Sequence, residues 1–171
     1  MKAVKPLVAV SACLLGENVR YDGGNRRDEN VLSLVTHFEL RPFCPEVGIG
    51  LGVPRPTLQL VREEDGVHVL GVEDRSHDVT VALNDYAVTL AGQWGDVCGV
   101  IFKCRSPSCG LGTTLLYDRE DLVIGTTSGA FAAEIERLFP GLPLSDEEML
   151  CDPQSREHFL QHVMSRHRTE E

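Results

Sequence analysis

A continuous apolar run near the amino terminus most constrains the fold of this chain. Leu7-Val8-Ala9-Val10 contains no polar residue and ends in Ser11-Ala12-Cys13. Such a run is typical of a central parallel strand that is buried on both faces. We therefore expect a parallel sheet at the core of the protein.

Strand and helix patterns alternate along the rest of the chain. Further strands are predicted near residues 57–61, 67–70 and 98–103, with Asp65-Gly66 as a hairpin turn, and short extended segments near 41–45, 113–117 and 142–144. Apolar residues at helical spacing predict helices over 29–40, 78–94, 128–138 and 152–166, whereas the Gly- and Pro-rich stretch 46–56 predicts a loop. This alternation predicts a Rossmann-like, three-layer α/β/α fold with a mainly parallel central sheet, in one domain covering residues 1–171.

The composition argues against several classes of protein. The chain has 171 residues and a net charge of −10, so it lacks the basic surface that grips nucleic-acid backbone. No apolar run approaches the length of a membrane span. The first thirteen residues loosely imitate a lipoprotein signal, but the run Leu7–Val10 is shorter than the roughly 7–15 apolar residues that a signal needs. We expect a cytoplasmic protein that binds a small molecule, without DNA or membrane partners.

Three of the six cysteines occupy equivalent places in the pattern. Cys13, Cys44 and Cys109 each lie just beyond a short extended or apolar segment, where the chain enters a Gly- or Pro-rich loop. In parallel α/β sheets, ligands bind beyond the carboxyl ends of the strands. If the three segments are neighbouring parallel strands, their thiols converge at one edge of the sheet.

The other cysteines have weaker claims to a site. Cys98 begins a predicted strand and Cys151 precedes the last helix, so we expect both to be structural. Cys104 is ambiguous, because it lies five residues before Cys109 and C-x4-C spacings occur in iron–sulfur proteins.

Three converging thiolates fit an incomplete metal site. A structural zinc ion normally has four protein ligands, whereas three cysteines on a 4Fe–4S cluster leave one iron open to a substrate. That iron is a soft Lewis acid suited to a sulfur-bearing substrate. Three alternatives remain: a zinc- or iron–sulfur-binding sensor or carrier, a thiol oxidoreductase that uses Cys104 and Cys109, and ordinary buried cysteines.

Polar residues near these cysteines are candidates for acid–base chemistry and for binding. Glu46 lies two residues after Cys44, and Ser106 lies three residues before Cys109. A solvated carboxylate and a turn-forming serine are the alternative interpretations. Arg55, between two prolines, and Arg26 are candidate ligands for an anionic group of the substrate.

Three motifs together resemble the thiouracil desulfidase family. They are Val10-Ser11-Ala12-Cys13-Leu14-Leu15-Gly16 with Arg20-Tyr21-Asp22-Gly23, then Cys44-Pro45-Glu46 leading through Gly50-Leu51-Gly52 to Pro54-Arg55-Pro56, and finally Ser106-Pro107-Ser108-Cys109-Gly110. The resemblance extends over about the whole chain, and the motifs occur in the family's order.

The resemblance implies a cofactor, a reaction and roles for particular residues. The cofactor is a 4Fe–4S cluster held by Cys13, Cys44 and Cys109. The reaction is the hydrolytic, non-redox removal of sulfur from thiolated pyrimidines, such as 2-thiouracil to uracil, or from thiouridine nucleotides. The substrate sulfur binds the open iron and leaves as hydrosulfide, with Glu46 and Ser106 as the acid–base groups. Cys104 departs from the family pattern.

Overall fold

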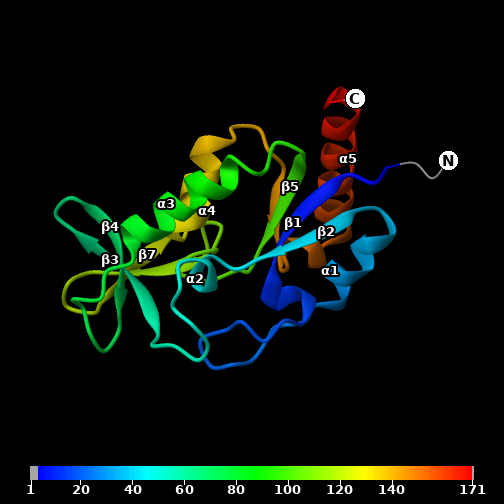
Figure 1. The fold of residues 1–171 in the computed structure, drawn as a ribbon. Helices are drawn as coiled ribbons and strands as arrows, with labels where there is room; N and C mark the ends of the chain where they lie inside the picture. Colours follow the sequence, from blue (N-terminus) through cyan, green and yellow to red (C-terminus); the bar gives the residue numbers. More distant parts are fainter. Residues whose placement is uncertain (1–3, 171) are drawn as a thin grey trace.

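The computed structural model describes residues 4–170 and contains two four-stranded sheets (Figure 1). Sheet A is parallel throughout and contains, in spatial order, β2 (Glu39–Phe43), β1 (Leu7–Ser11), β5 (Val97–Phe102) and β8 (Leu144–Asp146). Sheet B is mixed and contains, in spatial order, β4 (Gly66–Gly71), β3 (Leu58–Glu63), β6 (Thr114–Tyr117) and β7 (Val123–Thr127).

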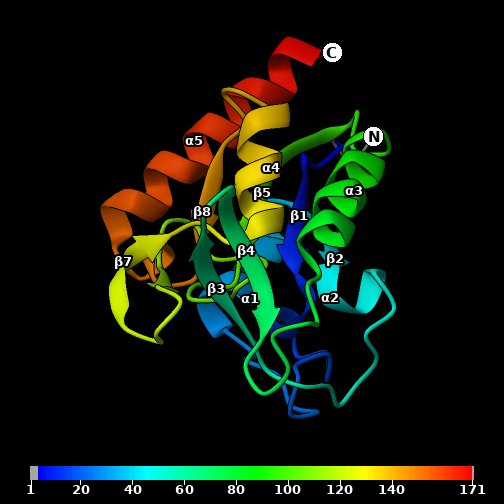
Figure 2. The same cartoon turned by 90° about the vertical axis from the view of Figure 1, so that its left-hand side faces the viewer.

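Helices cover both faces of sheet A, which produces the three predicted layers (Figures 1 and 2). One face packs against α3 (Thr80–Ala91) and α4 (Ala130–Leu138), and the other against α1 (Glu29–Ser33) and α5 (Pro153–Glu170). Strand β1 shows why its sequence is apolar throughout. Leu7 and Ala9 join the buried cluster beneath α3 and α4, whereas Val8 and Val10 join the cluster beneath α1 and α5. The predicted α/β class with a mainly parallel sheet is confirmed.

Aromatic side chains fill the layer between sheet A and α4. The ring of Phe43 lies 5.3 Å from Trp94, 5.4 Å from Phe131 and 6.0 Å from Phe102, measured between ring centroids. The contacts of Phe43 with Trp94 and Phe102 are edge-to-face, which adds to the free energy of burying the rings. Phe43 and Phe102 are the last residues of β2 and β5, so this cluster supports the strand ends where the cysteine loops begin.

Sheet B forms the other end of the molecule. The predicted β3–β4 hairpin is present, but its two-residue turn is Glu64-Asp65 rather than Asp65-Gly66, because Gly66, at φ 136°, already pairs with Glu63. The apolar side of the hairpin packs on α3, where Leu60 and Val69 meet Val79 and Leu83.

Three further local predictions were wrong. The predicted helix over 29–40 is α1 followed by a short 3₁₀ helix, η2 (Leu34–Thr36), and the chain then enters β2 at Glu39. Helical turns stop there because the backbone N–H of Glu39 bonds to Pro6 and starts the pairing with β1. The predicted loop 46–56 begins with a helical turn, α2 (Pro45–Gly48), and β7 was missed.

Short helical turns follow the carboxyl ends of three strands in sheet A. They are η1 (Ala12–Leu15) after β1, α2 after β2 and η3 (Met149–Cys151) after β8. Strand β5 instead leads into the irregular loop 103–113. The edge formed by these four segments is therefore compact but irregular, and it contains the largest group of cysteines.

Candidate active site

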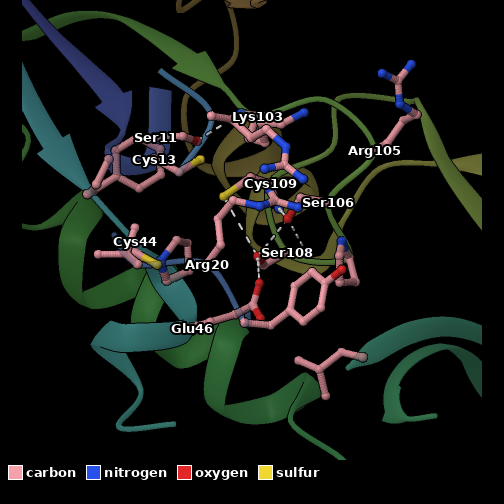
Figure 3. A pocket seen from close by; sticks show the side chains of 18 of the residues that line it. Ser11, Cys13, Arg20, Cys44, Glu46, Lys103, Arg105, Ser106, Ser108 and Cys109 are labelled. Carbon is pink, nitrogen blue, oxygen red and sulfur yellow. Dashed lines mark hydrogen bonds between the residues drawn. The ribbon is translucent and has the colours of Figure 1, made fainter. Parts of the chain in front are cut away.

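A cavity of about 360 Å³ opens at the carboxyl edge of sheet A. Its walls come from the ends of the adjacent strands β2, β1 and β5, from the loops that follow them, and from residues 19–26 and 55–58. Cys13, Cys44 and Cys109 all line it, and Figure 3 shows their sulfur atoms approaching from three separate segments. The parallel order of the strands brings together residues that are far apart in the sequence.

Each thiol is held by a different local structure. Cys13 lies in η1, and Cys44 is the residue just before α2, whose first position is Pro45. Cys109 lies in the loop 103–113, where the backbone N–H groups of Ser108 and Cys109 both donate to Ser106 Oγ, at 3.2 and 3.0 Å. Ser106 thus folds the tight turn that presents Cys109.

The Cys109 loop is also bound to the start of α4. Backbone N–H groups of Gly129, Ala130 and Ala132 donate to the carbonyls of Gly110, Pro107 and Ser108, at 2.8, 3.1 and 3.0 Å. These bonds satisfy donors that a helix amino terminus otherwise leaves unpaired. A Cβ at position 129 would lie 2.5 Å from the Ser108 carbonyl carbon, so the close approach requires glycine.

Burial raises the pKa of all three thiols. Desolvation is the main cause at Cys13 and Cys44, and it is strongest at the fully enclosed Cys109, whose pKa lies well above its usual value. The raised pKa values favour the neutral thiol form of these groups. A bound cationic group would supply the charge that stabilises them as thiolates.

The donor set fits a cluster better than a single ion. Within residues 4–170, no three His, Cys, Asp or Glu side chains lie close enough together to hold one metal ion. Yet three soft sulfur donors line a single cavity of about 360 Å³. Thiolates around a space wider than one ion are the usual setting of iron–sulfur clusters.

Glu46 is fixed in the cavity through both carboxylate oxygens. Arg55 Nε donates to Oε1 at 3.1 Å. Ser108 Oγ donates to Oε2 at 2.8 Å (Figure 3). The Glu46 and Arg55 side chains are only 13% and 4% exposed. Arg55 also donates to the carbonyl of Gly52 at 2.9 Å, so this arginine positions Glu46 as well as lining the cavity.

Ser108 is a candidate site residue that the sequence did not single out. Its hydroxyl joins Glu46 to Ser106, whose Oγ lies 3.1 Å from Ser108 Oγ. Ser106, the predicted acid–base serine, lines the cavity but does not contact Glu46 directly. The signal available in the sequence was the adjacency of Ser108 to Cys109.

Two arginines on the 19–26 segment also line the cavity. Arg26 is exposed and donates only to the neighbouring carbonyl of Asn25, at 2.9 Å. Arg20 was quoted as part of a motif but not predicted as a site residue. Its Nε is buried without a hydrogen-bond partner among the described residues, and its guanidinium lies 5.6 Å from the centre of the Tyr21 ring. An unpaired buried donor in a cavity is typical of a group that binds a ligand.

Cys104 lines the cavity, but its thiol is hydrogen-bonded to Glu147. Its Sγ donates to Glu147 Oε1 at 3.0 Å, and burial together with this carboxylate raises the pKa of Cys104 to about 12. No disulfide joins any of the six cysteines, all of which lie in the described range. Cys98 is buried at the start of β5, and Cys151 is exposed in η3.

Fold and site together define an α/β protein with a three-thiol cavity at the ends of parallel strands, beside a carboxylate held by an arginine and a serine. The family model described as 2-thiouracil desulfurase matches residues 8–147, so the chain belongs to the 2-thiouracil desulfurase family. The resemblance inferred from the three motifs is therefore confirmed.

Two further proteins are similar to this chain. The "Uncharacterized protein YbbK" of Bacillus subtilis (strain 168) is 33% identical over 113 residues, which cover 62% of this chain and 74% of the relative. A solved structure, described as the 4Fe-4S-dependent thiouracil desulfidase TudS, superimposes with a TM-score of 0.69 at 30% identity, covering 91% of this chain and 97% of that one. No helix among the described residues is long and apolar enough to cross a membrane.

Proposed function

We propose that this protein is a 4Fe–4S-dependent desulfidase that removes sulfur from thiolated pyrimidines by hydrolysis. One observation carries the proposal: Cys13, Cys44 and Cys109 line one cavity that also contains a carboxylate with fixed geometry. Family membership and the similarity to a 4Fe-4S-dependent enzyme support the same cofactor and substrate class. The proposed reaction converts a thiocarbonyl and water to a carbonyl and hydrogen sulfide, with no net oxidation or reduction.

The three cysteines would hold the cluster, and their number leaves one iron without a protein ligand. When bound, the cluster supplies a soft Lewis acid at that open position. Because all three thiols need a cation to become thiolates, metal binding would release protons and depend on pH.

Glu46 is the proposed general base. Its carboxylate would accept a proton from the attacking water, since it lies in the cavity and its orientation is fixed by Arg55 and Ser108. The hydroxyls of Ser108 and Ser106 form a chain from Glu46 Oε2, with steps of 2.8 and 3.1 Å. We assign this chain the return of a proton to the ring nitrogen of the substrate.

Arg26 and Arg20, which line the same cavity, fit the remaining part of the substrate. Arg26 and Arg20 would bind the substrate's second carbonyl oxygen or, for a thiouridine nucleotide, its phosphate. Arg55 is less suited to this role because it already bonds Glu46 and Gly52. Free cysteines and an oxygen-sensitive cofactor accord with the proposed cytoplasmic location.

The alternative thiol oxidoreductase is disfavoured by Cys104. A redox-active cysteine needs an accessible thiolate, whereas the Cys104 thiol is buried, donates to Glu147 and has a pKa of about 12.

Anaerobic reconstitution followed by iron and sulfide analysis tests the cofactor first. We expect about four irons and four sulfides per chain and loss of the thiocarbonyl absorbance when 2-thiouracil or 4-thiouracil is added. Cys109→Ala should lose both the cluster and the activity, whereas Cys151→Ala, at an exposed cysteine outside the cavity, should retain them. A wild-type protein that binds one zinc ion, or an active Cys109→Ala variant, would contradict the proposal.

A further inference from the structure

The last helix carries a pair of histidines that has no part in the chemistry proposed above. His158 and His162 are four residues apart in α5, so they lie on the same side of the helix, one turn apart. The centres of their rings are 4.0 Å apart. Both residues are exposed, and neither imidazole has a hydrogen bond or an ion pair with another of residues 4–170. The ring nitrogens are therefore available to a ligand.

The distance between the two rings suits the chelation of one metal ion. Imidazole nitrogens bind zinc and similar ions at about 2.0–2.1 Å, so two nitrogens on one ion are at most about 4.2 Å apart. Two rings with centres 4.0 Å apart and planes tilted by 51° have one nitrogen each within that reach. Helical zinc sites use the same spacing of two histidines at i and i+4. The pair therefore needs no change in the helix to hold an ion.

The surroundings of the pair determine which kind of ion it suits. His158 and His162 line a cavity of about 680 Å³, whose other walls include residues 141–145. Met149, which is 45% exposed, lines the same cavity, and no carboxylate side chain of the described residues does. Hard cations such as Mg²⁺ and Ca²⁺ need oxygen ligands, whereas imidazole and thioether groups suit late transition metals. The cavity therefore favours a late transition metal over Mg²⁺ or Ca²⁺.

The histidine pair is separate from the cavity that contains the three cysteines. The two cavities share no lining residue. Phe159 and Val163 on the buried side of α5 pack against sheet A, whereas the two histidines lie on its exposed side. The net charge of −10 also favours the approach of a cation to the protein. An ion at the pair therefore neither displaces a group bound to the cysteines nor depends on one.

We propose that His158 and His162 together bind one divalent ion of a late first-row transition metal. Each imidazole supplies one nitrogen, and water completes the coordination. The affinity should follow the general order for nitrogen ligands, in which Cu²⁺ binds more tightly than Ni²⁺ or Zn²⁺. This site is additional to the three-cysteine site and has a different donor set, nitrogen in place of sulfur.

Retention on a column of immobilised Ni²⁺ tests the pair in the complete chain without an affinity tag. An ion fixed to a resin reaches exposed histidines, so the result does not depend on what the cysteine cavity holds. Because chelation needs both imidazoles, His158→Ala and His162→Ala should each elute at an imidazole concentration about threefold to tenfold lower than the wild type. The double variant should elute only slightly earlier than either single variant. Losses that simply add in the double variant would mean two independent histidines and would overturn the proposal.

A histidine elsewhere on the protein provides the matched control. His77 is partly exposed, lies in the segment between β4 and α3 and does not line this cavity, so His77→Ala should elute with the wild type. The substitutions in α5 are at exposed positions and place alanine in a helix, so the variants should fold, which circular dichroism checks. Elution of the wild type together with the double variant overturns the proposal.

Titration calorimetry in solution then tests the choice of ion. The cluster-loaded protein is titrated anaerobically with Ni²⁺ and, separately, with Mg²⁺, so that the cavity thiols do not compete for the metal. We expect about one Ni²⁺ per chain, an affinity about tenfold or more lower in His158→Ala, and no binding of Mg²⁺. Equal Ni²⁺ affinities of the wild type and His158→Ala overturn the proposal. If the wild type takes up no cluster, the proposed function is wrong, and the column experiment still decides whether the histidine pair binds metal.

Discussion

Sheet A and sheet B differ most in how their strands are buried. All six residues of β5 in sheet A are buried, whereas four of the five residues of β7 in sheet B are exposed. Sheet A lies between two layers of helices, and the cavity with the three cysteines opens at the carboxyl ends of its strands. The candidate site therefore lies at the ends of the buried strands of sheet A. Side chains carried by rigid elements are held in position more accurately than side chains on mobile ones.

The largest effect is expected from Glu46, at the functional edge of sheet A. Glu46→Gln removes the proposed general base but keeps an oxygen that can accept from Ser108, so desulfidation should fall about 10²–10⁴-fold with the iron content unchanged. The matched control in sheet B is Glu63→Gln, which loses an ion pair with Arg119 outside the cavity and should leave the rate unchanged. Similar rates for wild type and Glu46→Gln would break the link between this edge and the chemistry.

A second prediction compares the stability of the two sheets. Phe102→Ala in β5 removes a fully buried ring from the aromatic cluster and should lower the free energy of unfolding by about 3–5 kcal/mol. Val123→Ala in β7, where the side chain is 54% exposed, should lower it by less than about 0.5 kcal/mol. Urea denaturation measures both, and comparable losses would show that the sheets are equally important to stability.

Gly129 lies between β7 and α4 along the chain, and its substitution tests how tightly the Cys109 loop is held. Gly129→Ala places a Cβ against the Ser108 carbonyl, so the loop must shift, at a cost of about 1–3 kcal/mol. We expect less iron bound per chain, measured after reconstitution. Gly95→Ala is the control, because its added Cβ meets no atom within 4 Å. Full iron content in Gly129→Ala would show that the loop can adapt.

The smallest effect is a pH dependence in sheet B. Hydrogen bonds to Asp78 and Asp65 raise the pKa of His68 above its ordinary value. The folded state therefore binds this proton more tightly, and the stabilisation is fully present below about pH 6.5 and lost as the pH rises through the folded pKa. Because His68, Asp65 and Asp78 lie near the surface, we expect this contribution to the free energy of unfolding to be less than about 1 kcal/mol. Unfolding free energies of wild type and His68→Asn should differ more at pH 5.5 than at pH 8.5, and a constant difference would contradict this linkage.

Sequence patterns predicted sheet A better than sheet B for a physical reason. Strands buried on both faces, such as β1 and β5, must be apolar throughout, so their sequences are distinctive. The edge strand β7 is short, exposed and contains Gly125, so neither alternation nor a long apolar run marks it. The end of α1 was also not predicted. The helical region stops before β2, and β2 begins where Glu39 bonds to Pro6, a residue distant in the sequence.

The candidate site could be located from sequence, but its hydrogen bonds could not. Loop positions after strands were enough to single out Cys13, Cys44 and Cys109, which the structure places around one cavity. That Ser108 rather than Ser106 contacts Glu46 depends on which serine folds the turn. The pairing of Lys103 with Glu147 depends on β8 lying next to β5, which the chain order alone does not specify.

The backbone bonds between the Cys109 loop and the start of α4 also bear on the order in which the protein matures. Because three carbonyls of the loop accept hydrogen bonds from N–H groups at the start of α4, the position of Cys109 depends on that helix being folded. A nascent chain whose α4 has not yet been synthesised would accordingly lack one corner of its metal-binding cavity.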